Sequence, residues 1–351
     1  MNDQIRSEIA VSPERIYLDA ATYGLPPRAA VEAYRAAIDG WETGAARFET
    51  DWEPAGEACR ALFARLIGTE PSNICLLPSV SAGIGTVAAS LPAGSVVLAA
   101  EDEFTSTVLP FAGAGTRSDI TIRTLPWEEL IAAIDGDIDL VAVSLTRAQD
   151  GRTIDLGALT VAAARHGTRV VVDATHALPF VPVRDHLSGI DFLVCHGYKH
   201  LLSPRGTAFG YINPRFLPYL APIHANWRTV GRSYGLPLGP VTNASAFDIS
   251  LAWHAWVGTQ PALERLVAWS GDGTVAASLE LAKRLARQLE VPEPTASLVC
   301  VPADAPEALV ERLEEQGLRA AGRGAYLRLS THVWNTEDEV DRAAALVNSM
   351  R

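Results

Sequence analysis

The chain is poor in cysteine, and the few cysteines it has are scattered. Cys59, Cys75, Cys195 and Cys300 are the four, and no two of them form a CxxC pair. This scatter argues against a disulfide framework and against a cysteine-based zinc cluster. We therefore expect no metal site and a reducing, cytoplasmic environment.

Positive charge is scarce relative to negative charge. The 351 residues include 29 Lys and Arg against 41 Asp and Glu, which gives a formal net charge of −12. Phosphate backbones and anionic lipid surfaces attract basic proteins and repel acidic ones. We therefore expect neither nucleic acid nor a membrane as a partner.

Long unbroken hydrophobic runs are also missing. Residues 72–100 contain no charged residue, but Pro78, Pro92 and three glycines interrupt them. A strand–turn–helix–strand unit explains such a segment better than a membrane-spanning helix does. The first residues, MNDQIRSEIA, lack the apolar region of a secretory signal. These absences favour a soluble protein.

The sequence does contain an alternation of short apolar runs and helical stretches. The runs that predict strands are Asn73–Leu77, Ser95–Ala99, Thr121–Leu125, Asp139–Ser144, Arg169–Val172, Ile190–Val194 and Thr207–Ile212. Helical stretches such as Leu156–Arg165 lie between several of them. Apolar strands joined by helical crossovers predict an α/β fold with a mostly parallel central sheet covered on both faces.

The N-terminal part of the chain predicts a helix rather than a strand. Val31, Tyr34, Ile38 and Trp41 fall on one helical face shortly after two prolines. We expect residues 1–44 to join a small domain, and residues 45–245 to form a large one.

The C-terminal third alternates between helix and strand again. A long helical region follows Asp248, and strands are expected near Ser297–Val301 and Tyr326–Ser330. A last helix is expected from Thr336, with Glu339 completing a capping box. Residues 246–351 therefore predict a connecting helix and a small α+β domain.

Two predicted strands end in residues that suit one cofactor chemistry. The segment RVVVDA ends a buried strand in Asp173, and CHGYKH places Lys199 after another apolar strand. Alone, an Asp at a strand end is commonly a turn or helix cap, and a lysine is ordinarily solvated. Between apolar strands, however, desolvation lowers the pKa of a lysine amine and makes it nucleophilic. A strand-end Asp together with a strand-end Lys is what a pyridinium cofactor held as a Schiff base requires.

Four segments resemble the class V aminotransferase family of fold type I pyridoxal 5'-phosphate (PLP) enzymes. They read YLDAATYGLPP, VVDATHALPF, HGYKHLLSPRGTAFGYI and LRLSTHVWNTEDEVDR, and they follow the family's order from Tyr17 to Arg342. The resemblance is nearest to the branch with the ergothioneine-pathway C–S lyase, isopenicillin N epimerase and cysteine desulfurases. It implies a large PLP-binding domain, a small α+β domain and a homodimer with shared active sites.

The resemblance assigns three residues to the chemistry at the cofactor ring. Lys199 occupies the position of the Schiff-base lysine, and Asp173 that of the partner of the pyridine nitrogen. His176 stands where the family has Gln or His next to the cofactor's phenolic oxygen. A satisfied core histidine is the alternative interpretation of His176.

The resemblance also indicates where the cofactor phosphate would bind. PSVSAGIG follows a strand and opens a helix, and it places Val80 and Ser81 at the contacting positions. Tyr198 matches a tyrosine that contacts phosphate in kynureninases. His196 stands where many relatives have a phosphate-binding serine.

Further positions concern the open face of the cofactor ring and the substrate. Phe104 of EDEFTSTVLPF stands where desulfurases have a stacking histidine, although a core phenylalanine is the alternative. Arg328 matches an arginine that binds the substrate carboxylate, for which its forked guanidinium is suited. Ala21 and Thr22 match an N-terminal segment that lines the same pocket.

Two parts of the family pattern are altered or ambiguous. RAQDG lacks the asparagine usual in that loop, so Arg147 or Gln149 is the candidate replacement. Thr259 matches a residue that reaches the neighbouring subunit's phosphate in some relatives, and Trp227 is a second candidate near the substrate. A plain apolar helix face explains the region of Thr259 equally well.

The family catalyses several reactions, so the expected reaction must be inferred from the residues that this sequence contains. A desulfurase needs a nucleophilic cysteine on a loop shortly before the carboxylate-binding arginine, and Gly317–Leu327 contains none. We therefore expect β-elimination from a cysteine S-conjugate, which needs only the lysine base, the ring and the carboxylate clamp. An aminotransferase or epimerase, and a decarboxylating oxidative deaminase, are the alternatives. A non-catalytic PLP-binding protein would not need to retain Arg328.

Overall fold

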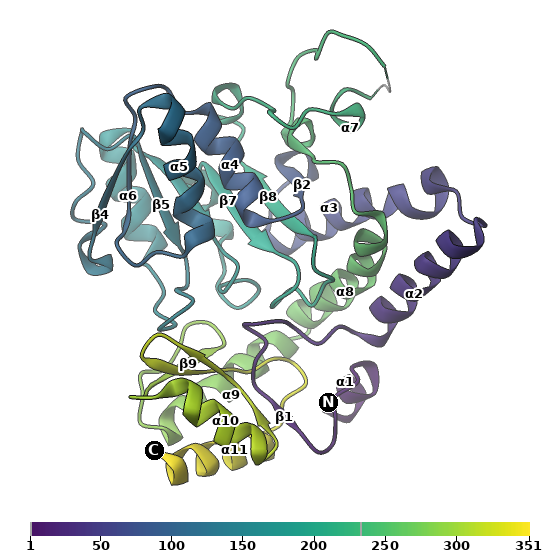
Figure 1. The fold of residues 1–351 in the computed structure, drawn as a ribbon, viewed down its shortest axis with the longest axis vertical. Coiled ribbons are helices and arrows are strands. Elements are labelled where there is room, and N and C mark those ends of the chain that lie inside the picture. Colours follow the sequence, from purple (N-terminus) through teal and green to yellow (C-terminus); the bar gives the residue numbers. More distant parts are fainter. Residues whose placement is uncertain (1, 232–233) are drawn as a thin grey trace.

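The central feature of the fold is a mixed sheet in the larger part of the molecule (Figure 1). The computed structural model describes residues 2–231 and 234–351. Within them the large sheet contains β2 (Ile74–Leu77), β3 (Val96–Ala100), β4 (Thr121–Leu125), β5 (Leu140–Ser144), β6 (Arg169–Asp173), β7 (Phe192–His196) and β8 (Ala208–Ile212). Their spatial order is β2-β8-β7-β6-β5-β3-β4. Only β8 runs antiparallel to its neighbours, so the expected mostly parallel α/β sheet is confirmed.

Helices cover both faces of this sheet because strand residues alternate between two apolar cores. Val141 and Val143 of β5 join one core, whereas Leu140 and Ala142 join the other. The helices of the large domain are α3 (Glu53–Ile67), α4 (Val80–Ser90), α5 (Thr105–Ser118), α6 (Leu156–His166) and α7 (Trp227–Val230). The cores place α4 and α5 on one face, and α3 and α6 on the other.

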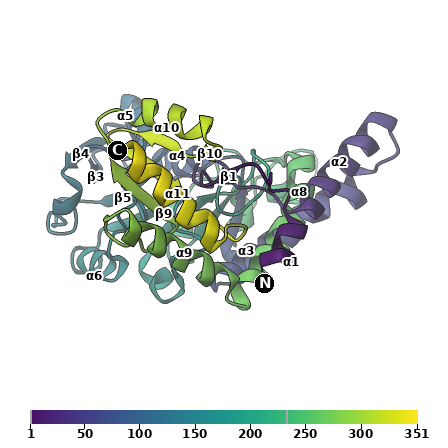
Figure 2. The same cartoon turned by 90° about the horizontal axis from the view of Figure 1, so that it is seen from below.

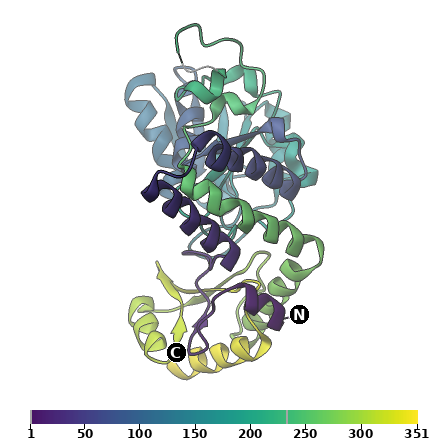
Figure 3. The ribbon, with the colours of Figure 1, turned by 90° about the vertical axis from the view of Figure 1, so that its right-hand side faces the viewer.

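The smaller part of the molecule is a second α/β unit that contains both chain ends (Figure 3). Its antiparallel sheet has the order β11 (Ala321–Arg323), β12 (Tyr326–Ser330), β9 (Leu298–Pro302). A separate parallel pair joins β1 (Ile16–Tyr17) to β10 (Leu318–Arg319). Helices α9 (Thr274–Gln288), α10 (Pro306–Glu315) and α11 (Glu337–Met350) pack against these strands (Figure 2).

The start of α11 agrees with the sequence. The Thr336 hydroxyl accepts a hydrogen bond from the Glu339 amide at 3.1 Å, and the Glu339 carboxylate accepts one from the Thr336 amide at 3.3 Å. This reciprocal pair satisfies two amides that the first helical turn leaves free. The expected capping box is therefore present.

The N-terminal helices lie beside the long helix that connects the two domains. They are α1 (Asn2–Glu8) and α2 (Arg28–Thr43), and the connecting helix is α8 (Trp253–Gly271). The expected apolar face of α2 packs on α8, because a Cβ at Gly258 would lie only 3.2 Å from Tyr34, and the Trp41 ring lies 5.5 Å from that of His254. This face is only partly covered, since Tyr34 is half-buried and Trp41 remains 65% exposed. The fully buried residues of the helix are Ala30 and Ala37.

One short segment after β12 fastens the small domain to the large one. The ring Nε2 of His332 lies 3.1 Å from the backbone oxygen of His200, and both side chains are fully buried. Trp334 stacks on His332 and donates its indole N–H to the backbone oxygen of Tyr17 at 3.2 Å. The residue after Lys199 is thus held by the small domain. No helix in the described part of the chain is long and apolar enough to span a membrane.

A buried ion pair ties α3 to the edge strand β2. Asp248 is 1% exposed and accepts hydrogen bonds from the Arg60 guanidinium at 2.5 Å and from the Leu76 amide at 2.8 Å. Removing one partner of such a pair leaves an uncompensated buried charge. The pair therefore restricts which substitutions this edge tolerates.

We predict that Asp248→Asn lowers the free energy of unfolding by about 3 kcal/mol, because Arg60 then loses its buried counterion and keeps only the exposed Glu57 carboxylate. Glu293→Gln is the control, since Glu293 pairs with Arg287 at 2.8 Å where both side chains are about half exposed. The control should change stability by less than about 0.5 kcal/mol. Urea unfolding followed by circular dichroism measures both. Equal midpoints for the two variants would contradict the assignment.

Candidate active site

A small pocket lies where the carboxyl ends of the central strands meet. Its lining residues are Phe104, Ser144, Thr146, Asp173, Thr175, His176, His196 and Lys199. They follow β3, β5, β6 and β7, which is the edge at which open α/β sheets place their ligands. Five of the eight residues are site residues expected from the sequence.

Lys199 is buried in this pocket without a salt bridge to a carboxylate. Its side chain is 8% exposed, and its Nζ lies 3.0 Å from Nε2 of His176. Burial lowers the lysine pKa to about 8, against the opposing effect of the nearby Asp173 charge. A neutral, nucleophilic amine is therefore available near neutral pH.

Asp173 closes β6 and is held in place by hydrogen bonds rather than by a cation. Its carboxylate accepts a hydrogen bond from the Thr175 amide at 2.9 Å, and the Thr107 hydroxyl lies 3.5 Å away. Burial raises the pKa of this carboxyl group, although those hydrogen bonds oppose the shift. A cationic nitrogen placed beside it would be stabilised, since a buried carboxylate lacks competing water.

Two histidines of the pocket have ring nitrogens without partners. Burial lowers the pKa of His176 and brings that of His196 to about 3, so both rings are neutral. Nε2 of His196 accepts a long hydrogen bond, 3.4 Å, from the Val80 amide. Nδ1 of each ring is buried and has no hydrogen-bond partner. Such orphaned atoms indicate space for a polar ligand.

The first turn of α4 provides the candidate anion site. Ser79 caps the helix by accepting a hydrogen bond from the Ala82 amide at 3.2 Å, and its hydroxyl lies 3.1 Å from that of Ser81. The exposed Ser81 and the buried Val80 stand at the helix start, where free amides favour negative charge. Tyr198 lies beside this end, with its ring 4.9 Å from that of His196.

Phe104 faces the pocket rather than the core. Its side chain is 43% exposed, and the Lys199 Nζ lies 5.5 Å from its ring centre. The alternative of a core phenylalanine is thereby excluded. Its backbone is fixed by Glu103, which accepts hydrogen bonds from the Phe104 amide at 2.7 Å and from the Ser144 hydroxyl at 2.5 Å. Glu103 was not among the site residues expected from the sequence. Its position three residues after β3, at the carboxyl edge of the sheet, could have suggested it.

Arg328 is a buried cation that forms no salt bridge in the described part of the chain, and the buried carboxylate of Asp19 offsets its charge only in part. The side chain is 3% exposed, and burial lowers its pKa to about 10. Its two terminal nitrogens donate to the backbone oxygen of Ala148 at 2.8 Å and to the hydroxyl of Thr22 at 3.1 Å. Its Nε has no hydrogen-bond partner. The Ala21 amide donates to the Ser330 hydroxyl at 2.8 Å, which ties the expected N-terminal segment to β12.

Other expected residues do not reach the pocket. Thr259 is fully buried, and its hydroxyl donates to the backbone oxygen of Ala255 at 2.8 Å. Trp227 lies on α7, which Figure 1 places at the end of the large domain away from the small one. Arg147 and Gln149 both bind Asp102, and neither lines the pocket. Thr146, which was not expected from the sequence, does line the pocket.

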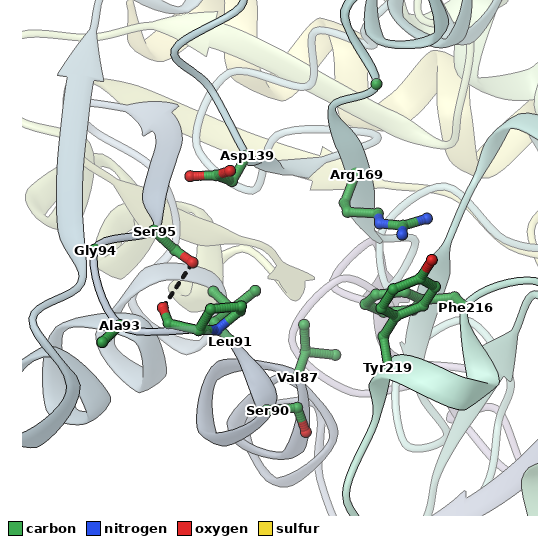
Figure 4. A pocket seen from close by; sticks show the side chains of 12 residues that line it. Val87, Ser90, Leu91, Ala93, Gly94, Ser95, Asp139, Arg169, Phe216 and Tyr219 are labelled. Atoms are coloured by element: carbon green, nitrogen blue, oxygen red, sulfur yellow. Dashed lines mark hydrogen bonds between the residues drawn. The ribbon is translucent and has the colours of Figure 1, made fainter.

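A different pocket at the opposite ends of the strands lacks these features (Figure 4). Its Arg169 pairs with Asp191 at 3.3 Å and stacks on Tyr219, and its Ser95 donates to a backbone oxygen. Its polar groups are thus satisfied internally. Within residues 2–231 and 234–351, no group of three or more His, Cys, Asp or Glu side chains could hold a metal ion.

Comparison with known proteins agrees with this geometry. The sequence model of the aminotransferase class-V family matches residues 16–290. The chain belongs to the class V aminotransferase family. It is 26% identical over 325 residues to the uncharacterized aminotransferase YcbU of Bacillus subtilis, covering 84% of each chain. It is 24% identical to isopenicillin N epimerase of Streptomyces clavuligerus, covering 99% of this chain and 98% of the relative.

Solved structures show the same fold. A cystine C–S lyase in complex with its product cysteine persulfide superposes with a TM-score of 0.84 at 19% identity, covering 96% and 98% of the two chains. The cysteine desulfurase CsdA of Escherichia coli superposes with a TM-score of 0.82 at 20% identity, covering 100% and 98%. The protein therefore has the fold of PLP enzymes of fold type I, as expected.

The residues of the pocket fit PLP, the cofactor of this family. The neutral amine of Lys199 suits the cofactor aldehyde, and the buried Asp173 suits a protonated ring nitrogen. The α4 start suits the phosphate. The exposed ring of Phe104 provides a stacking surface.

Lys199 should be the attachment point of the cofactor, and the chain offers a simple test of this. The sequence has two lysines, and Lys283 lies on α9 paired with Glu280 at 2.7 Å. After incubation with PLP and borohydride reduction, peptide mapping should find the label on Lys199. The labelling rate should rise with pH up to about 8 and then level off, because only the unprotonated amine reacts. A label on Lys283 alone would refute the assignment.

Proposed function

We propose that this protein is a PLP-dependent lyase that cleaves the C–S bond of a cysteine S-conjugate by β-elimination. One observation carries the proposal: the buried amine of Lys199 lies within electrostatic reach of the buried guanidinium of Arg328, which has no salt bridge, and the cysteines of the described chain are buried or half-buried with raised pKa values. Elimination needs those two groups and the cofactor. Every alternative reaction needs something more.

Arg328 would bind the α-carboxylate of the amino acid. Its guanidinium is buried without a salt bridge, and Asp19 offsets its charge only in part, so a substrate anion would stabilise it. Its terminal nitrogens are held in place by hydrogen bonds to Ala148 and Thr22. A carboxylate accepting two hydrogen bonds from this fork would fix the orientation of the substrate.

Lys199 would then remove the α-proton from the bound amino acid. His176 is neutral and lies 3.0 Å from the lysine nitrogen, so it can hold that nitrogen in place as the proton moves. Asp173 would keep a proton on the cofactor ring nitrogen. Bound PLP supplies the sink for the electrons left at the α-carbon. The sulfur then leaves from the β-carbon as a thiol or sulfenate.

Desulfuration through a protein persulfide lacks a nucleophile here. Gly317–Leu327 contains no cysteine, and most of it is taken up by β10, β11 and the turn before β12. Cys300 lies opposite Arg328 on β9, but burial raises the pKa of its thiol to about 12. A thiol that stays protonated near neutral pH is a poor nucleophile.

The alternatives make different demands on the pocket. Epimerisation needs a second base on the opposite face of the cofactor, where Phe104 offers none. Transamination needs a keto-acid acceptor, and a decarboxylating oxidative deaminase needs oxygen. The relatives named above include an epimerase and an aminotransferase, so product analysis must separate these reactions.

We also propose that the active protein is a homodimer. Tyr234 and Leu236 are 91% and 93% exposed, and Leu238 is also exposed. Large apolar side chains gathered on a surface mark a contact site. A twofold dimer is the most common closed assembly. Trp227, on the same side of the large domain, remains a candidate residue of that contact.

The reaction is tested by product analysis without an acceptor. With an S-substituted cysteine, the holoenzyme should consume one water and release a thiol, ammonia and pyruvate in equal amounts. Arg328→Gln should lower kcat/KM by about 100-fold, since a buried ionic contact is lost. Arg312→Gln, an exposed arginine in the last turn of α10, should change it by less than about twofold. Alanine, an inverted amino acid, or carbon dioxide with oxygen uptake would each assign a different reaction.

Assembly is tested by sedimentation of the holoenzyme. We expect a dimer, and we expect the double variant Tyr234→Ser with Leu236→Ser to dissociate at concentrations where the parent does not. Loss of two apolar anchors removes about 3 kcal/mol or more from an interface. The control is Leu109→Ser, an exposed leucine on α5. A fully active monomeric parent would overturn the proposal.

A further inference from the structure

An apolar pocket of about 500 Å³ opens beside the active site. Its walls are the N-terminal segment at Thr22 and Tyr23, helix α2, and the turn after Lys199. Aromatic rings of Tyr23, Tyr34 and Tyr198 line it. We name it the side pocket.

The side pocket lies next to Arg328 and Lys199, because a neighbour of each lines its wall. Thr22 lines the pocket and its hydroxyl lies 3.1 Å from the Arg328 guanidinium. Tyr198 lines it as well, and its ring centre lies 5.7 Å from the Lys199 Nζ. The Gly24 amide donates to the Tyr198 backbone oxygen at 3.0 Å, which joins the two walls. A substrate held by its carboxylate at Arg328 therefore has this space next to it.

The charge of the side pocket is opposite to that of the chain. Arg35 and Arg205 are its only charged lining residues, whereas the whole chain has a net charge of −12. Neither arginine forms an ion pair in the described part of the chain. Arg205 lies over the Tyr198 ring, 5.3 Å from its centre. Stacking of this kind leaves the edge N–H groups of a guanidinium free for an anion.

We propose that the side pocket receives the substrate's side chain and selects one with an aromatic or aliphatic body and an anionic end. The tyrosines would contact the body, and Arg205 and Arg35 would bind the anion. This inference rests on the proposed function, because it assigns the substituent on sulfur in the cysteine S-conjugate. Substrates with small neutral substituents would leave both arginines unused.

The test compares two substrates of nearly equal size. S-(4-carboxybenzyl)cysteine carries the anion, and S-(4-methylbenzyl)cysteine does not. The parent holoenzyme should prefer the first in kcat/KM for pyruvate release. Arg205→Gln and Arg35→Gln should each reduce that preference by about fivefold, as expected for a charge contact that is partly exposed. Arg117→Gln, on the exposed end of α5, is the matched control and should leave the preference unchanged.

The possible outcomes separate this inference from the proposed function. If neither substrate yields pyruvate, the dissociation constants of both are measured by titrating the holoenzyme absorbance. An Arg205-dependent preference in binding would then support the side pocket while the elimination reaction is rejected. Equal preference in parent and variants overturns the side pocket. The side pocket is also overturned if an arginine variant alters the sedimentation of the protein but not its preference between the two substrates. A second copy of the chain would then occupy the side pocket.

Discussion

The burial of Lys199, Asp173 and Arg328 without salt bridges is the constraint on which the site depends. Each charged group taken out of water costs several kcal/mol unless a partner replaces the solvent. Here the direct partners are mainly hydrogen bonds to backbone groups and hydroxyls, and the carboxylates of Asp173 and Asp19 offset the charges of Lys199 and Arg328 only in part. The remaining fold must supply that stability. The same burial produces an amine with a lowered pKa and a guanidinium ready for an anion.

Two domains supply the groups, so their contact decides whether the site exists. Lys199 and Asp173 come from the large sheet, whereas Arg328 comes from β12 of the small one. The bond between His332 and the His200 backbone holds the small domain directly behind the lysine. The N-terminal segment completes the arrangement, since Thr22 touches Arg328 and Ala21 is bound to Ser330. A change in that contact would alter substrate binding and lysine position together.

Much of the fold was predictable because short-range patterns carry it. Continuous apolar runs marked the strands to within about two residues, and the capping box at Thr336 marked the last helix. The apolar face of α2 was also identifiable, and Tyr34 of that face packs against Gly258 of α8. The sequence did not show how far this face is covered, and Trp41 remains 65% exposed. Periodicity identifies a helix and its apolar face, but packing decides how much of that face is buried.

The candidate site shows the same division. The residues at strand ends, Asp173 and Lys199, were identifiable from the sequence because parallel strands bring their carboxyl ends to one edge. Thr146 was not identified, because its place in the pocket lining depends on contacts across the fold. By itself the sequence determined the elements, the sheet type and the pair of residues at its edge. Only the tertiary structure decided which cations stay unpaired, because burial and counterions are properties of residues distant in the chain.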